Sequence, residues 1–152
     1  MYNKYMNVAI SEAKKALENG EIPVGAVIVK DNIVIAKAHN TREENQNALE
    51  HAEVNAIKKA CEYLNNWRLE NCDMYVTMEP CPMCCGAILQ SRIKNVYYGA
   101  YSKDNGCMGT VVNLPKLLKN SSLTVYGGIM EDECSLMLKN FFASLREGKK
   151  WS

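Results

Sequence analysis

The segment from Met74 to Gly99 limits the fold of this chain more than any other. Met74 to Thr77 predicts a short buried strand, Pro82 to Arg92 predicts a helix with proline in its first turn, and Asn95 to Gly99 predicts a second strand. A strand, a helix and a strand in this order form a right-handed parallel crossover. The sequence therefore predicts a sheet that contains parallel strands and is covered by helices.

The elements around this unit extend the same pattern. Val24 to Lys30 and Ile33 to Ala38 are β-branched runs joined by Asp31-Asn32, which favours a tight hairpin turn. The other predicted elements are helices over 1–19, 50–64, 113–118 and 131–147, a fifth strand over 123–126, and loops over 40–49 and 99–109. We expect a single domain over residues 1–152, an α/β fold built as a three-layer α/β/α sandwich with a five-stranded mixed sheet.

Composition and charge exclude several classes of protein. The chain has 152 residues, is 47% hydrophobic and 23% charged, and is thus too apolar for a disordered segment. It contains no run of about 18 apolar residues and begins without a signal peptide, so we expect a cytoplasmic protein with no membrane association and reduced cysteines. A net charge of +1 argues against nucleic-acid binding by bulk electrostatics alone, although residues 92–152 carry nine basic and five acidic side chains.

Two short motifs combine residue types that bind metals. One is H-x-E at residues 51–53, and the other is P-C-x-x-C at residues 80–84, each at the beginning of a predicted helix. Cys81 and Cys84 share one face of a helical turn, so both sulfurs can bind one ion, with His51 as a third ligand. Three protein ligands leave one position of a tetrahedral zinc site open, as in catalytic sites. We therefore expect one Zn²⁺ per chain.

Glu53 has the spacing expected of a general acid/base at such a site. It is two residues from His51, which makes it a poor ligand from the same helix face, yet it can still hydrogen-bond a water at the metal. The positive ends of the two helix dipoles favour thiolates at Cys81 and Cys84. Glu53 is therefore the catalytic residue that we predict.

Two other interpretations of these cysteines remain open. Cys81 and Cys84 could be a redox pair, which would leave His51 unexplained. A closed structural zinc site would need a fourth ligand, for which the chain offers Cys85, Cys61, Cys72, Cys107 or His39. We expect Cys61, Cys72, Cys107 and Cys134 to be small apolar residues of the core.

H-x-E combined with P-C-x-x-C is the signature of zinc-dependent nucleobase deaminases. The chain also resembles the bacterial tRNA adenosine deaminase family over nearly its whole length, in the segments 22–27, 66–69, 75–81, 91–93 and 132–134 and at Asn40. The resemblance implies a cytidine-deaminase-like fold and a homodimer. It also implies hydrolytic deamination of adenosine to inosine at the wobble position of a tRNA anticodon.

The resemblance implies roles for individual residues. His51, Cys81 and Cys84 would hold zinc, Glu53 would move protons, Asn40 would hydrogen-bond the nucleoside, and Val24 would form an apolar wall. The partner would be the anticodon loop of a tRNA, with an arginine tRNA expected, and no nucleotide cofactor is needed. Our own candidates for contacts to this loop are Tyr101, Phe142, the neighbouring Phe141, Arg146, Lys149 and Lys150.

Two departures from the family pattern concern the side that would face RNA. Tyr101, Ser102 and Lys103 follow Gly99-Ala100, where family members commonly have an acidic residue, and the last predicted helix has no long basic tail. Two alternatives therefore remain. The first is a deaminase of a free base or nucleoside such as guanine, cytosine or cytidine, and the second is a zinc-bearing partner of another deaminase subunit.

Overall fold

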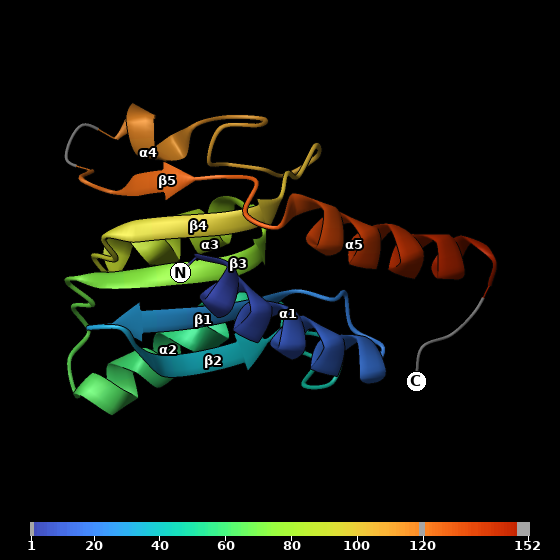
Figure 1. The fold of residues 1–152 in the computed structure, drawn as a ribbon, viewed down its shortest axis with the longest axis horizontal. Coiled ribbons are helices and arrows are strands. Elements are labelled where there is room, and N and C mark those ends of the chain that lie inside the picture. The colour runs from blue at the N-terminus through green and yellow to red at the C-terminus, as the bar shows by residue number, and fades with distance from the viewer. Residues whose placement is uncertain (1, 119–120, 149–152) are drawn as a thin grey trace.

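The structure is a computed structural model that describes residues 2–118 and 121–148. A five-stranded sheet in the order β2-β1-β3-β4-β5 forms its middle layer (Figure 1). The strands are β1 (Gly25–Lys30), β2 (Ile33–His39), β3 (Cys72–Met78), β4 (Asn95–Ala100) and β5 (Thr124–Tyr126). β1 pairs antiparallel with β2 and β3, whereas β3, β4 and β5 are parallel to one another. The predicted mixed sheet is confirmed.

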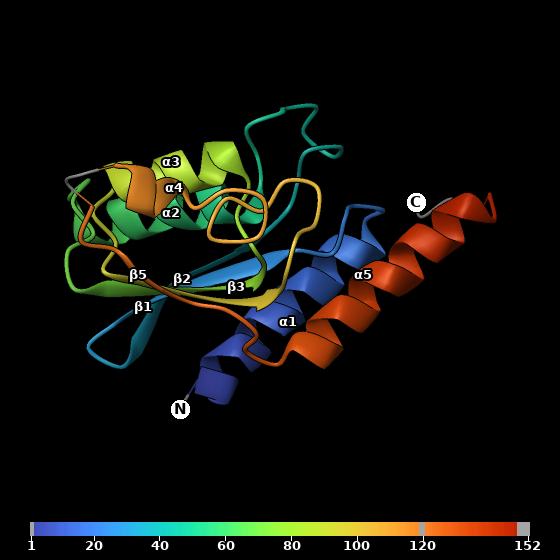
Figure 2. The ribbon, with the colours of Figure 1, turned by 90° about the horizontal axis from the view of Figure 1, so that it is seen from above.

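Helices cover both faces of this sheet, which confirms the three-layer sandwich. α1 (Tyr2–Glu18) and α5 (Glu131–Arg146) lie on one face, and α2 (Ala52–Leu64), α3 (Pro82–Gln90) and the short α4 (Leu114–Leu117) lie on the other (Figure 2). Within the described residues, none of the helices combines the length and the apolar character that crossing a membrane requires.

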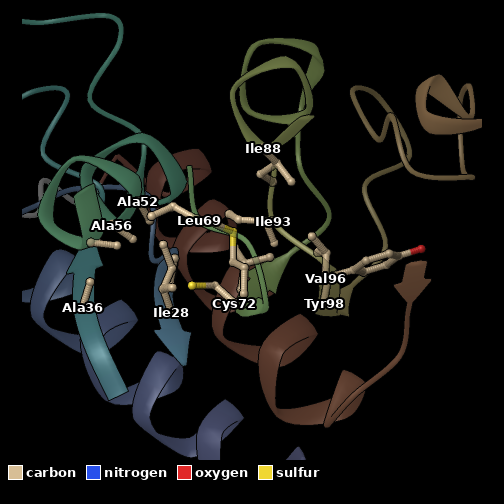
Figure 3. Close-up of a cluster of buried hydrophobic side chains, with 14 of the residues drawn as sticks. Ile28, Ala36, Ala52, Ala56, Leu69, Cys72, Ile88, Ile93, Val96 and Tyr98 are labelled. Carbon is tan, nitrogen blue, oxygen red and sulfur yellow. The ribbon is translucent and has the colours of Figure 1, made fainter. Parts of the chain in front are cut away.

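Alternating side chains of the central strands fill two separate cores. Ile28 of β1 packs with Ala56 of α2 and Ile88 of α3 on one face (Figure 3). The adjacent Val27 packs on the other face with Met6 of α1 and Leu138 of α5. Because successive residues of a strand point to opposite faces, a strand covered on both sides is apolar along its buried part, as β1 is from residue 25 to residue 29.

The hairpin between β1 and β2 has the predicted turn. Asp31 and Asn32 both adopt positive φ angles, 51° and 62°, as a type I′ turn requires. Two predicted helices are shorter than expected. α2 begins at Ala52 rather than Glu50 because the preceding residue is still extended, and α3 ends at Gln90 because Arg92 has a φ of 66°.

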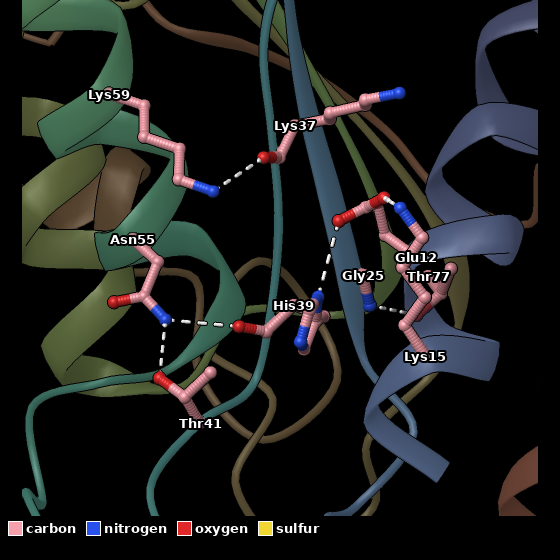
Figure 4. A network of polar contacts seen from close by, with 9 residues as sticks. All are labelled: Glu12, Lys15, Gly25, Lys37, His39, Thr41, Asn55, Lys59 and Thr77. Carbon is pink, nitrogen blue, oxygen red and sulfur yellow. Dashed lines mark hydrogen bonds and ion pairs between the residues drawn. The ribbon is translucent and has the colours of Figure 1, made fainter. Parts of the chain in front are cut away.

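His39, the last residue of β2, connects the two helix layers next to Asn40. Its Nδ1 lies 3.2 Å from Glu12 Oε1 of α1, and its carbonyl accepts a hydrogen bond from Asn55 Nδ2 of α2 (3.0 Å; Figure 4). Glu12 also accepts a hydrogen bond from Lys15 Nζ (2.7 Å). These contacts fix the point at which the chain leaves the sheet and enters the loop that follows.

The predicted core cysteines agree with the structure in three of four positions. Cys72, Cys107 and Cys134 are buried, whereas Cys61 is half-buried at the edge of the core. The prediction for Cys61 is therefore wrong in part. Cys61 packs against the core without being fully buried, and its thiol is directed to the carbonyl of Trp67 (3.8 Å).

Candidate metal centre and substrate pocket

The three predicted ligands come from the beginnings of two neighbouring helices. His51 is the N-cap of α2 and Cys81 is the N-cap of α3, both with extended backbone angles. N-cap side chains usually accept a hydrogen bond from their own helix. Neither His51 nor Cys81 makes such a bond, so both side chains are available to bind a metal ion. Cys84 follows one turn into α3 and is fully buried.

Their donor atoms converge as a tetrahedral metal site requires. His51 Nδ1 lies 3.6 Å from Cys81 Sγ and 3.5 Å from Cys84 Sγ, and all three atoms lie within 4.8 Å of one another. Zinc bonds of about 2.3 Å to sulfur and about 2.05 Å to nitrogen, at the tetrahedral angle, place these atoms about 3.6 Å apart. The residues present thus fit zinc. We call His51, Cys81 and Cys84 the ligand triad.

No fourth protein ligand joins the triad in the part of the chain that the structure describes. Cys85 is buried in the core and directs its thiol to the carbonyl of Cys107 (3.9 Å), and the His39 ring contacts Glu12. Neither these two residues nor Cys61, Cys72 or Cys107 belongs to the converging group. The arrangement therefore favours an open, catalytic type of site over a closed structural one.

Glu53 is buried beside the triad, in the first turn of α2. Burial raises the pKa of its carboxyl to about 7, because an apolar environment disfavours the charged form. A carboxyl with this pKa can both accept and donate a proton near neutral pH, as a general acid/base must.

Hydrogen bonds within the triad shift the pKa values of its members. A hydrogen bond from the Cys84 thiol and a weaker effect of the hydrogen bond from His51 lower the pKa of Cys81 to about 4. The hydrogen bond to Cys81 in turn raises the pKa of His51. A thiolate at Cys81 is the form that binds a metal.

A pocket of about 250 Å³ opens over the triad. This volume is just under the range of about 300–1,000 Å³ typical of small-molecule sites, so it suits one base-sized group. Val24, Asn40, Glu53 and Phe142 line it, together with two of the ligands, His51 and Cys81. A larger cavity of about 600 Å³ lies at the opposite end of the sheet beside Glu70 and Lys94, away from the triad.

Asn40 is held in a fixed orientation at the edge of this pocket. Its Nδ2 donates to the carbonyl of Ile22 (3.4 Å), and its Oδ1 accepts from the backbone N–H of Arg42 (3.1 Å). The following loop is anchored by the buried Glu21, whose carboxylate accepts hydrogen bonds from the N–H groups of Glu43 (3.0 Å) and Glu44 (2.7 Å).

The predicted RNA-facing residues divide into three groups. Phe142 lines the pocket, and its neighbour Phe141 is buried in the core. Tyr101 lies outside the pocket, packs edge to face on Tyr98 (5.3 Å between ring centroids), and borders an adjoining cavity together with Arg146. Lys149 and Lys150 lie outside the described residues.

Several pocket residues were missed by the sequence analysis, namely Ile22, Arg42, Ala52, Met78, Glu79, Ser102, Asp104 and Asn105. Ser102, Asp104 and Asn105 follow β4, whose parallel neighbour β3 ends beside the triad. Ligands of open α/β sheets bind beyond the carboxyl ends of parallel strands. That rule would have pointed to this loop.

The sandwich, the open triad and the buried carboxyl beside it define a deaminase of the cytidine-deaminase-like fold. The model of the MafB19-like deaminase family matches residues 2–146. The chain is 49% identical over 147 residues to the tRNA-specific adenosine deaminase of Bacillus subtilis (strain 168), covering 96% of this chain and 91% of that protein. It is 44% identical over 145 residues to the tRNA-specific adenosine deaminase of Aquifex aeolicus (strain VF5), covering 93% and 94%.

A solved structure from a study of A-to-I editing by tRNA:A34 deaminases at the wobble position of transfer RNA superposes with a TM-score of 0.85. That structure is 39% identical to this chain, with 89% of this chain and 99% of the other covered. The chain belongs to the tRNA-specific adenosine deaminase family.

Proposed function

We propose that this protein deaminates adenosine to inosine at the wobble position of a tRNA anticodon, with one zinc ion held by His51, Cys81 and Cys84. The observation that supports this most is the buried Glu53, which lies beside a three-ligand site in a pocket large enough for one nucleobase. When bound, zinc supplies the Lewis acidity that activates a water for attack at neutral pH.

Glu53 carries the protons of the reaction. It takes one proton from the attacking water as the new bond forms at C6 of adenine and delivers it to N1. It then takes the second proton from the oxygen now bonded to C6 and delivers it to the amino group, which leaves as ammonia. Water and adenosine thus give inosine and ammonia. A pKa near 7 lets the same carboxyl perform both transfers.

The remaining pocket residues position the base. Asn40 is oriented to hydrogen-bond the nucleoside, and Val24 supplies an apolar wall. An unpaired anticodon base enters such a pocket more easily than a base within a duplex, because less stacking and pairing is lost. Phe142 at the pocket edge, with Tyr101 and Arg146 on the adjoining surface, would contact the rest of the anticodon loop.

Mass-spectrometric detection of inosine tests this function. The zinc-loaded protein is incubated with an adenosine-bearing anticodon stem-loop of an arginine tRNA, and in parallel with free adenosine, guanine, cytosine and cytidine. Inosine in the RNA, with the small molecules unchanged, is the expected result. Turnover of a free base or nucleoside with unmodified RNA would replace the tRNA assignment by the alternative substrate class.

We further propose a cytoplasmic homodimer. Support for the homodimer comes from four exposed apolar side chains that are close together in the sequence, Val111, Val112, Leu117 and Leu118, which are 43–68% exposed. Exposed apolar side chains mark interaction sites where they gather into one patch. Light scattering should give twice the chain mass for the wild type and a lower mass for Leu117→Glu, and a monomeric wild type would refute the dimer.

A further inference from the structure

The carboxylate of Glu79 is buried, and a single loop supplies its hydrogen-bond donors. Oε1 accepts from the N–H of Ser102 (3.2 Å) and from the hydroxyl of Thr110. Oε2 accepts from the N–H groups of Met108 (3.0 Å) and Thr110 (3.1 Å). A carboxylate offers about four lone-pair sites. These four donors fill them.

The loop can close around this carboxylate because residue 106 is glycine. A Cβ at Gly106 would lie 2.6 Å from Glu79 Oε1 and 2.5 Å from the carbonyl of Ser102. Both distances are shorter than non-bonded atoms tolerate, so any side chain at this position would displace either the loop or the carboxylate. The N–H of Gly106 instead donates to the carbonyl of Ser102 (3.0 Å) and completes the turn.

This loop forms part of the pocket wall. Ser102, Asp104 and Asn105 line the pocket, and Glu79 itself is two residues from the ligand Cys81. The end of β3 therefore leads directly to a metal ligand and also carries the group that holds the loop. The loop is joined to the ligand region once more, where the N–H of Cys107 donates to the carbonyl of Pro80 (3.0 Å).

We propose that Glu79 is a positioning residue, which sets substrate binding by holding the loop of residues 102–110 against the pocket. This inference rests on the proposed deaminase function. Although Glu79 lies at the pocket, it acts through the loop and not on the substrate, because the loop donors already occupy its acceptor oxygens. Without these hydrogen bonds, a smaller fraction of molecules has the loop in the arrangement that binds substrate. The apparent affinity for substrate falls in proportion to that fraction.

Steady-state kinetics of three variants test the proposal. Glu79→Gln keeps one acceptor oxygen and turns an amide group toward the loop donors, so KM should rise about tenfold while kcat stays within about threefold. Gly106→Ala keeps the Glu79 side chain, but its Cβ displaces either the loop or the carboxylate, so it should give the same change in KM with little change in kcat. Thr110→Val removes only the hydroxyl donor and should give a smaller rise in KM. Zinc content should stay at one per chain in all three.

Glu70→Gln is the matched control, because it changes an exposed carboxyl at the opposite end of the sheet; its KM should equal that of the wild type. A fall in kcat with unchanged KM in Glu79→Gln, or a wild-type KM in both Glu79→Gln and Gly106→Ala, would overturn the proposal. If Glu79→Gln does not fold, Gly106→Ala and Thr110→Val decide. The kinetics use the anticodon stem-loop as substrate. If the wild type deaminates only a free base, that base is the substrate instead. The tRNA assignment then fails, but the same variants still test the role of Glu79.

Discussion

His51 Nδ1 lies 3.6 Å from Cys81 Sγ although 30 residues separate them in the chain. The contact exists because α2 and α3 lie on the same face of the sheet (Figure 2) and pack on each other, with these two residues as their N-caps. The ligand triad is thus built by the packing of two helices, and metal binding and folding should depend on each other.

Cys84→Ala tests this dependence. Loss of one of three ligands should lower zinc affinity by more than about 100-fold, and the variant should unfold at a lower temperature. Zinc per chain is measured by elemental mass spectrometry after gel filtration. The control is Cys85→Ala, which removes a neighbouring buried thiol outside the triad and should keep its zinc. Normal zinc binding by Cys84→Ala, with loss in Cys85→Ala, would make Cys85 the ligand.

Phe142 should contribute to RNA binding by stacking. Base–aromatic stacking is worth about 1–3 kcal/mol, so Phe142→Ala should raise KM for the stem-loop about 5- to 150-fold. Leu145→Ala, an exposed residue on the same helix outside the pocket, should leave KM unchanged. Equal KM values for Phe142→Ala and the wild type would remove Phe142 from the substrate surface.

The Glu12 carboxylate should make stability depend on pH in the acid range. Burial alone would raise its pKa, but hydrogen bonds from Lys15 and His39 outweigh burial and hold the pKa below the usual 4.5. A carboxyl with a lowered folded-state pKa stabilises the fold above pH 4.5, and this contribution is lost as the pH falls through the folded-state pKa.

Urea unfolding of wild type and Glu12→Gln at pH 7 and at pH 3.5 measures this contribution. The difference in free energy of unfolding between the two proteins should be larger at pH 7 than at pH 3.5. Glu18→Gln, an exposed position on the same helix, serves as the control and should show little difference at either pH. If the difference in free energy of unfolding between the wild type and Glu12→Gln does not change with pH, Glu12 does not form its ion pair with Lys15.

Local signals explain which features could be predicted from the sequence. Asp31-Asn32 adopts the turn that its residue types favour, and the positions of His51 and Cys81 at helix starts follow from motif spacing. The hydrogen bonds from the 102–110 loop to Glu79 join positions up to 31 residues apart, and no periodicity in the sequence predicts them. The position of Tyr101 at the adjoining cavity, outside the pocket, could not be predicted for a similar reason, since packing on Tyr98 sets the direction of its ring.

The deaminase mechanism depends on proton transfer by Glu53, which is measured by comparing inosine formation in the wild type and Glu53→Gln. Wild type and variant are brought to one zinc per chain, and inosine at the wobble position of the stem-loop is followed by mass spectrometry. We expect inosine from the wild type and a rate at least about 100-fold lower from Glu53→Gln, because a positioned general acid/base contributes about 10²- to 10⁴-fold. A near-normal rate for zinc-loaded Glu53→Gln would show that Glu53 does not transfer the protons.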